Sequence, residues 1–156
     1  RVVALAETLI AIGCDEVGLA DTSGYANPVQ VKCLTQAVWR AVGHQHLSGV
    51  HLHNTRGQGL ANVIAALDVG LTTVDASLAG LGGCPFAPGA SGNIVTEDLV
   101  FLLEAMGLRT GIHIDGLVAA RALLAEALPG EPLYGFIAAA GVPNGFRPAS
   151  QAPRSS

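Results

Sequence analysis

The chain alternates short apolar segments, each the length of a β-strand, with segments whose apolar residues have helical spacing. The pattern predicts strands at residues 16–21, 47–53 and 73–78, and helices at residues 1–12, 28–42, 57–67, 96–106 and 114–128. Each connection between strands is long enough to hold a helix, which is how parallel strands are joined. The sequence therefore predicts an α/β protein whose parallel sheet is made of about three βα units.

Two of the predicted helices start at residues that suit a helix cap. Asn27 is followed by Pro28, and asparagine before a proline at the first helical position is a typical helix start. Thr96 is the expected cap of the later helix, because its hydroxyl can accept a backbone N–H of the first turn. Gly43 and Gly107 follow the expected ends of these two helices.

Polar side chains fall at the carboxyl ends of the predicted strands. Asp21 ends the first strand, and His51 and His53 end the second. Successive strand side chains point to opposite faces, so the two histidines share one face and Asn54 lies on the other. Two imidazoles on one face can converge on a metal ion; the alternative is that they are ordinary polar residues at a strand end. Both a (β/α)8 barrel and a doubly wound sheet bind ligands at this edge.

A glycine-rich loop follows the third predicted strand at residues 79–93, Ala-Gly-Leu-Gly-Gly-Cys-Pro-Phe-Ala-Pro-Gly-Ala-Ser-Gly-Asn. Glycine loses the most conformational freedom on ordering, so this composition indicates a backbone that bends sharply or approaches a ligand closely. Cys84 lies between a glycine and a proline and is therefore held on a constrained turn. The other cysteines, Cys14 and Cys33, are expected to be small buried residues, since three cysteines without tight spacing do not indicate a disulfide framework.

Charge and hydropathy exclude several classes of protein. The net charge is -4, the isoelectric point is about 5.6, and no basic cluster is present, which argues against nucleic-acid binding. Hydrophobic residues make up 50% of the chain and charged residues 13%, as in a globular protein, and no apolar run is long enough to span a membrane. The first residue is Arg1 and not Met, so we expect the true N-terminus, with any targeting segment, to be missing.

Three motifs together resemble a known family. They are His51-Leu-His53-Asn-Thr, then Gly80-Leu-Gly-Gly-Cys84-Pro-Phe-Ala-Pro-Gly-Ala-Ser-Gly-Asn93, and then Thr96-Glu-Asp-Leu. The combination is similar to the 3-hydroxy-3-methylglutaryl-CoA (HMG-CoA) lyases, which belong to the metal-dependent TIM-barrel lyases and condensing enzymes with a pyruvate carboxyltransferase-type domain. The resemblance runs from about residue 13 to about residue 121. The cysteine loop indicates the lyase branch, whereas related synthases and aldolases share the His-x-His motif.

The resemblance implies the C-terminal part of a (β/α)8 TIM barrel, about three βα units, followed by a C-terminal helical extension. We expect a partial barrel domain at residues 1–128 and the extension at residues 129–156, with a disordered tail from about residue 147. A complete TIM barrel needs about 250 residues, so the chain alone is expected to be incomplete and inactive. A non-catalytic barrel fragment is accordingly one of the open alternatives.

The resemblance also implies the residues of the site. His51, His53 and Asn93 would bind a divalent Mg or Mn ion, and His51, Asp21 and Cys84 would be catalytic. A carboxylate from the barrel's first strand, which in the family carries an Arg-Asp pair and is not in this chain, would complete the metal site. Each assignment has an alternative: Asp21 bonding nearby backbone amides, Asn93 capping the next helix, and Cys84 as an inert buried thiol.

The implied reaction is the cleavage of HMG-CoA to acetyl-CoA and acetoacetate, as in leucine degradation and ketone body formation. The same chemistry on a bulkier 3-hydroxyglutaryl-CoA homologue is the alternative, and the cysteine loop disfavours a Claisen-type synthase. The expected partner is an acyl-CoA substrate, with no nucleic acid and no membrane, and the family suggests a homodimer. The expected compartment is the cytoplasm in a bacterium or the mitochondrial matrix in a eukaryote.

Overall fold

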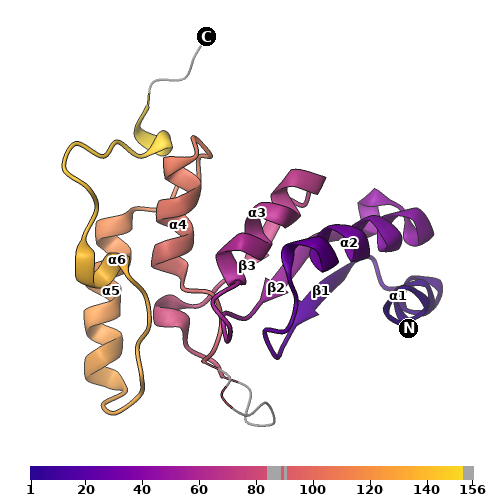
Figure 1. The fold of residues 1–156 in the computed structure, drawn as a ribbon, viewed down its shortest axis with the longest axis horizontal. Coiled ribbons are helices and arrows are strands. Elements are labelled where there is room, and N and C mark those ends of the chain that lie inside the picture. Colours follow the sequence, from indigo (N-terminus) through magenta and orange to yellow (C-terminus); the bar gives the residue numbers. More distant parts are fainter. Residues whose placement is uncertain (84–88, 90, 153–156) are drawn as a thin grey trace. The chain divides into compact units, whose positions relative to one another are not determined.

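The computed structural model describes residues 1–83, 89 and 91–152 (Figure 1). Contacts within the chain define two compact units, which we describe separately. The first comprises residues 1–75 and 83–93, and the second comprises residues 76–82 and 94–156. In the part of the chain that the structure describes, no helix is long and apolar enough to cross a membrane.

The first unit is a parallel three-stranded sheet with its connecting helices. Its elements, in chain order, are α1 (Val2–Ala11), β1 (Val17–Asp21), α2 (Pro28–Val42), the 3-10 turn η1 (His44–His46), β2 (Leu47–Leu52), α3 (Gly59–Val69) and β3 (Thr73–Asp75). The strands lie in the order β1-β2-β3, and both pairs are parallel. The predicted α/β class, with parallel βα units, is therefore confirmed.

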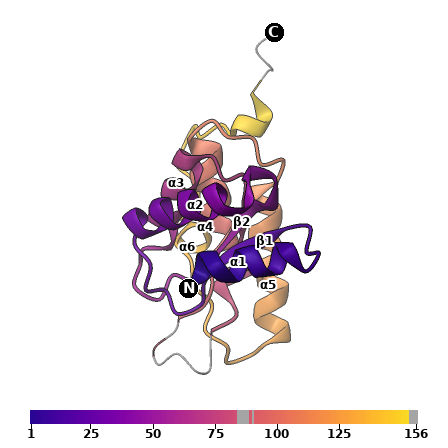
Figure 2. The same ribbon diagram turned by 90° about the vertical axis from the view of Figure 1, so that its right-hand side faces the viewer.

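The core of the first unit lies between the sheet and the helices α2 and α3, which pack side by side (Figures 1 and 2). Val50 and Leu52 of β2 are buried on this side, and His51 between them faces the other way. Val38 and Val63, from the two helices, are completely buried. The hydrophobic layer thus fixes which face of β2 carries polar side chains.

The predicted start of α2 is confirmed, whereas the predicted cap at Thr96 is wrong. The Asn27 side chain accepts the backbone N–H of Gln30, and the Gln30 side chain accepts that of Asn27, each at 3.1 Å. Thr96 is instead the first residue of its helix, and Val95 before it gives no side-chain cap. The Thr96 backbone N–H is already satisfied, because it donates to the Ser77 carbonyl at 2.9 Å.

The second unit is mostly helical. Its elements are the 3-10 turn η2 (Leu78–Gly80), α4 (Thr96–Ala105), α5 (Ile114–Ala127), α6 (Ile137–Ala140) and the 3-10 turn η3 (Ala149–Gln151). A cluster of buried apolar residues joins these helices: Val100, Ile114 and Ile137, with Phe101, Leu117 and Phe146 packed against them. The domain boundary predicted near residue 128 stays a prediction.

Glu97, at the start of α4, is completely buried and ties three segments together. Its carboxylate accepts the backbone N–H of Ala79 at 3.0 Å and pairs with Arg121 of α5 at 3.2 Å. Arg121 also donates to the carbonyl of Tyr134 at 2.6 Å. Ala79 has a left-handed backbone with φ of 56°, a conformation that is unfavourable for a residue with a Cβ, so the Glu97 contact stabilises a strained turn.

Glu104, near the end of α4, is a second buried carboxylate, with only 2% of its surface exposed. It accepts hydrogen bonds from the backbone N–H and the hydroxyl of Thr110 and from those of Ser150. These four donors outweigh burial, which acts in the opposite direction, and lower the pKa of Glu104 to about 2. The sequence predicts a disordered tail from about residue 147; in the structure, residues 149–151 form η3, and Ser150 within it contacts Glu104.

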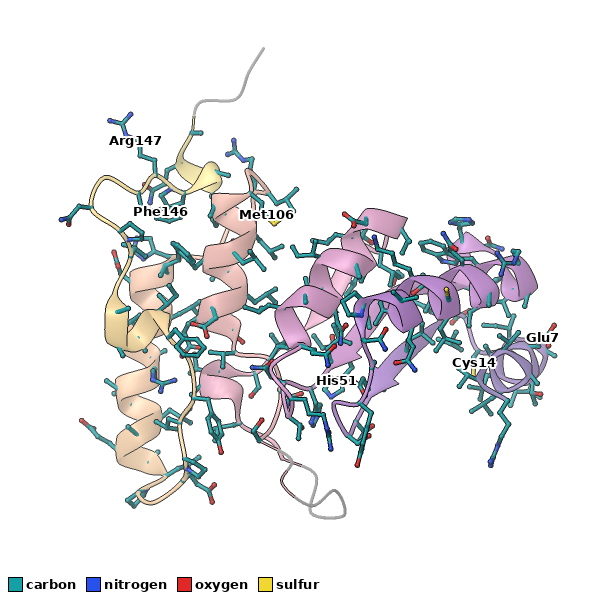
Figure 3. The ribbon with its side chains drawn as sticks, viewed as in Figure 1. Glu7, Cys14, His51, Met106, Phe146 and Arg147 are labelled. Atoms are coloured by element: carbon teal, nitrogen blue, oxygen red, sulfur yellow. The ribbon has the colours of Figure 1, made fainter. Side chains whose placement is uncertain are left out.

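The cysteine expectation is wrong for Cys14 and Cys33, which are both exposed. Cys14 lies just beyond the end of α1, outside any packed face (Figure 3). Cys33 lies on α2, away from the face formed by the buried residues Val31, Thr35 and Val38. Small apolar character was therefore a poor guide to the burial of either thiol.

We predict that replacing Glu104 by glutamine lowers the free energy of unfolding by about 2 kcal/mol at pH 7, because the amide has one acceptor oxygen and no charge. The carboxylate has a lowered pKa in the folded state, so its stabilising effect is complete above about pH 4.5 and is lost as the pH falls toward about 2. Urea unfolding at several pH values measures both effects. The exposed Glu126→Gln serves as the control, and equal losses for the two variants would contradict the prediction.

Candidate metal centre

Two histidines meet at the carboxyl end of the sheet in the first unit. His51 lies near the end of β2, and His53 follows it by two residues (Figure 3). Their Nε2 atoms are 3.2 Å apart, and the two rings meet edge to face with centroids 5.1 Å apart. The structure thus brings together the two imidazoles that strand alternation placed on one face.

The spacing of these nitrogens suits a pair of metal ligands. Two nitrogens each about 2.1 Å from one ion, at an angle of about 90 to 110°, lie roughly 3.0 to 3.4 Å apart. His53 is 5% exposed. Burial lowers its pKa below the ordinary 6.5, His51 lowers it further, and the charge of Asp21 raises it. A neutral imidazole is the form that binds metals, so the pair fits a divalent ion.

Asn93 lies beside His53 on the neighbouring backbone. The two residues form an isolated antiparallel bridge, and the backbone N–H of Asn54 donates to the Gly92 carbonyl at 3.0 Å. The capping residue of α4 is Val95, so Asn93 is not that cap. The backbone of Asn93 therefore lies beside that of His53.

Asp21 ends β1, the strand next to the histidines. Its two carboxylate oxygens accept the backbone N–H groups of Tyr25 and Ala26, each at 3.0 Å. These bonds match the structural alternative for Asp21, in which it stabilises the turn after the strand. Its charge also raises the pKa of His53, so this carboxylate acts electrostatically on the candidate site as well.

Arg56 and Tyr25 join the two loops that follow β1 and β2, and no sequence pattern predicted this contact. The Arg56 guanidinium lies 3.8 Å above the centre of the Tyr25 ring. It also donates to the carbonyls of Ser23 and Gly24 at 3.1 and 3.3 Å. These contacts of Arg56 therefore hold the loop that follows Asp21 against the loop that follows the histidines.

Two other side chains define the edge of the site. Asn54 lies outside the histidine pair, as predicted, and its Oδ1 accepts the backbone N–H of Gly59 at the start of α3. Asp75 ends β3, and its Oδ2 is 3.6 Å from Nδ1 of His51. Sequence reasoning missed Asp75, because its proximity depends on the register between two strands.

Cys84, which the sequence analysis assigned to catalysis, lies outside the described residues. Within residues 1–83, 89 and 91–152, no group of three or more His, Cys, Asp and Glu side chains is arranged to hold a metal ion. Within these residues, a metal ion held by the histidine pair would therefore need at least one ligand of another kind or from elsewhere.

Comparison with known proteins finds one matching family and several similar lyases. The profile of the HMGL-like family matches residues 1–124. The hydroxymethylglutaryl-CoA lyase YngG of Bacillus subtilis is 42% identical over 85% of this chain and 44% of its own length. The (R)-citramalyl-CoA lyase of Chloroflexus aurantiacus is 46% identical over 90% of this chain and 44% of its own length. The chain thus spans less than half the length of these relatives.

A solved structure of an HMG-CoA lyase is also similar to this chain. The HMG-CoA lyase of Acinetobacter baumannii, in complex with coenzyme A and 3-methylmalate, superposes with a TM-score of 0.84 at 47% sequence identity. The match covers 94% of this chain and 48% of that protein. The arrangement of helices and strands in this chain is therefore that of about half of the solved enzyme.

We predict that the packing between the two loops makes Gly24→Ala more destabilising than Gly57→Ala. Both glycines have left-handed φ angles, +63° and +69°, but an added Cβ at Gly24 would lie 2.8 Å from the Thr55 Cβ, whereas at Gly57 it would meet nothing within 4 Å. Backbone strain alone should cost about 1 kcal/mol, and the clash about 1 to 2 kcal/mol more. Denaturant unfolding of both variants measures the difference; equal losses would show that the loops are not packed as described.

Proposed function

The chain belongs to the HMGL-like family, and on this premise we propose that the full-length protein is a metal-dependent lyase that cleaves HMG-CoA to acetyl-CoA and acetoacetate. Its parallel βα units are part of the (β/α)8 barrel of that family. The observation that carries the proposal is the approach of the two Nε2 atoms of His51 and His53 to 3.2 Å at the carboxyl end of the sheet. Catalytic groups of such barrels lie at this end.

We propose that the ion is Mg or Mn and that three residues of this chain hold it. His51 and His53 would bind through Nε2, and Asn93 through its side-chain oxygen. A carboxylate from outside this chain would complete the shell, since oxygen ligands favour these ions. When bound, the ion supplies Lewis acidity to the tertiary hydroxyl and to a neighbouring carboxylate oxygen of the substrate.

The remaining steps fall to side chains of this chain. A base takes the proton of the tertiary hydroxyl, and the carbon–carbon bond breaks as the oxygen forms the ketone of acetoacetate. We assign the base to Asp21, and we propose that His51, whose Nε2 lone pair would bind the ion, orients the hydroxyl through that ion; the two residues lie at the ends of adjacent paired strands. The electron pair passes to the acetyl-CoA enolate, which we propose is protonated at carbon by the Cys84 thiol.

A second substrate is favoured by a specific observation. The citramalyl-CoA lyase relative matches 90% of this chain at 46% identity. Citramalyl-CoA has a tertiary hydroxyl at the same position as HMG-CoA, so the same bond cleavage would yield acetyl-CoA and pyruvate. A bulkier 3-hydroxyglutaryl-CoA homologue is the third substrate to test.

The proposed products indicate the metabolic pathways in which the enzyme would act. Acetyl-CoA and acetoacetate would place the reaction in leucine degradation and ketone body formation. The homodimer, and the cytoplasm or the mitochondrial matrix as compartment, stay predictions from the family. A protein with no lyase activity on any of these thioesters would instead match the non-catalytic alternative.

We predict that the full-length protein releases acetyl-CoA from HMG-CoA or citramalyl-CoA when Mg or Mn is added, and that His53→Ala lowers kcat/KM at least about 100-fold, because a metal ligand is lost. Chromatography of the thioesters and assay of acetoacetate and pyruvate identify the substrate. His46→Ala is the matched control, because His46 lies at the opposite end of β2 and bonds the Asp15 carbonyl. Undiminished activity of His53→Ala would refute the metal assignment.

A further inference from the structure

We propose that Asp75 is a positioning residue: its carboxylate holds a proton on Nδ1 of His51 and so presents the unprotonated Nε2 of that ring to the divalent ion. The proposal deepens the function proposed above and rests on it. Asp75 would touch neither the ion nor the substrate, and it would act through the histidine alone.

The sheet register places the two side chains together. β2 and β3 are parallel, and His51 and Asp75 are directly paired across them. Paired residues of neighbouring strands project from the same face of a sheet. The Asp75 carboxylate accordingly lies 3.6 Å from Nδ1 of His51, while Nε2 of the same ring faces His53 at 3.2 Å.

The chemistry of imidazole connects these two contacts. A neutral ring has one N–H and one nitrogen with a free lone pair, and the metal needs the lone pair. If Nε2 of His51 binds the ion, the proton must lie on Nδ1, which is the nitrogen that faces Asp75. Histidines that bind metals commonly donate this second N–H to a carboxylate, which fixes the ring and raises its basicity.

The separation of 3.6 Å is longer than a direct hydrogen bond. The Asp75 side chain is 67% exposed, whereas that of His51 is 37% exposed. An exposed side chain at the end of a strand can rotate to close a gap of a few tenths of an ångström. The contact is thus one that ion binding would tighten.

The two histidines differ in what holds them. His53 is buried, and within the described residues its Nδ1 has no hydrogen-bond partner, so packing fixes its orientation. His51 is only partly buried and lacks that packing. A polar partner on the far side of the ring is therefore needed for His51 rather than for His53, and Asp75 supplies it.

The experiment measures Mn²⁺ binding to the metal-free full-length protein by the electron paramagnetic resonance signal of free Mn²⁺. Asp75→Ala should raise the Kd about 10- to 100-fold, and Asp75→Asn should have a smaller effect, since its oxygen still accepts the N–H. Asp68→Asn is the matched control, because Asp68 is an exposed aspartate paired with Lys32 away from the site, and its Kd should stay within about twofold. Thermal melting of each variant checks that folding is unchanged.

A second readout separates positioning from simple charge attraction. In the metal-free protein, nitrogen NMR of the wild type should show neutral His51 protonated at Nδ1, and Asp75→Ala should show a mixture of the two tautomers. A Kd for Asp75→Ala within twofold of wild type, with Mn²⁺ still bound by the wild type, would overturn the positioning role alone. A wild-type protein that binds no Mn²⁺ would overturn the metal site and, with it, the role of Asp75.

Discussion

Parallel pairing of three strands is the constraint on which the candidate site depends. It brings the carboxyl ends of β1, β2 and β3 to one edge, so that Asp21, the histidine pair and Asp75 become neighbours although they are far apart in sequence. The buried side chains of β2 then decide which face is left for polar groups. A shift of register by one residue would turn His51 into the hydrophobic layer. The apolar core therefore determines the face of the sheet on which the histidine side chains lie.

Local signals in the sequence predicted much of this unit. Alternation within one strand was enough to pair His51 with His53, and the Asn27 cap follows from residues three apart. Contacts across strands and loops were not predictable in the same way. Asp75 needs the register between β2 and β3, and the stacking of Arg56 on Tyr25 needs the course of two loops. Short-range patterns identify such residues only as polar.

The second unit shows the limit of sequence patterns most clearly at its buried acids. Glu97 and Glu104 lie on α4, where a pattern of helical spacing would assign glutamate to the solvent. Each is buried because its partners lie outside α4: Arg121 for the first, and Thr110 just after the helix with Ser150 near the end of the chain for the second. Burial of a carboxylate is stable only when such donors compensate for lost hydration, and helical spacing alone does not indicate them.

The facing imidazoles also bear on how the protein would choose among ions. Nitrogen donors bind copper, nickel and zinc more tightly than magnesium or manganese, following the general order of stability for divalent metals. Two rings with nitrogens 3.2 Å apart would therefore capture whichever of these competitors a purification column or growth medium supplies. The ion found in a purified sample would then depend on the metals present during growth and purification. Preference for a physiological ion must come from the oxygen donors around the pair and from the supply of metals inside the cell.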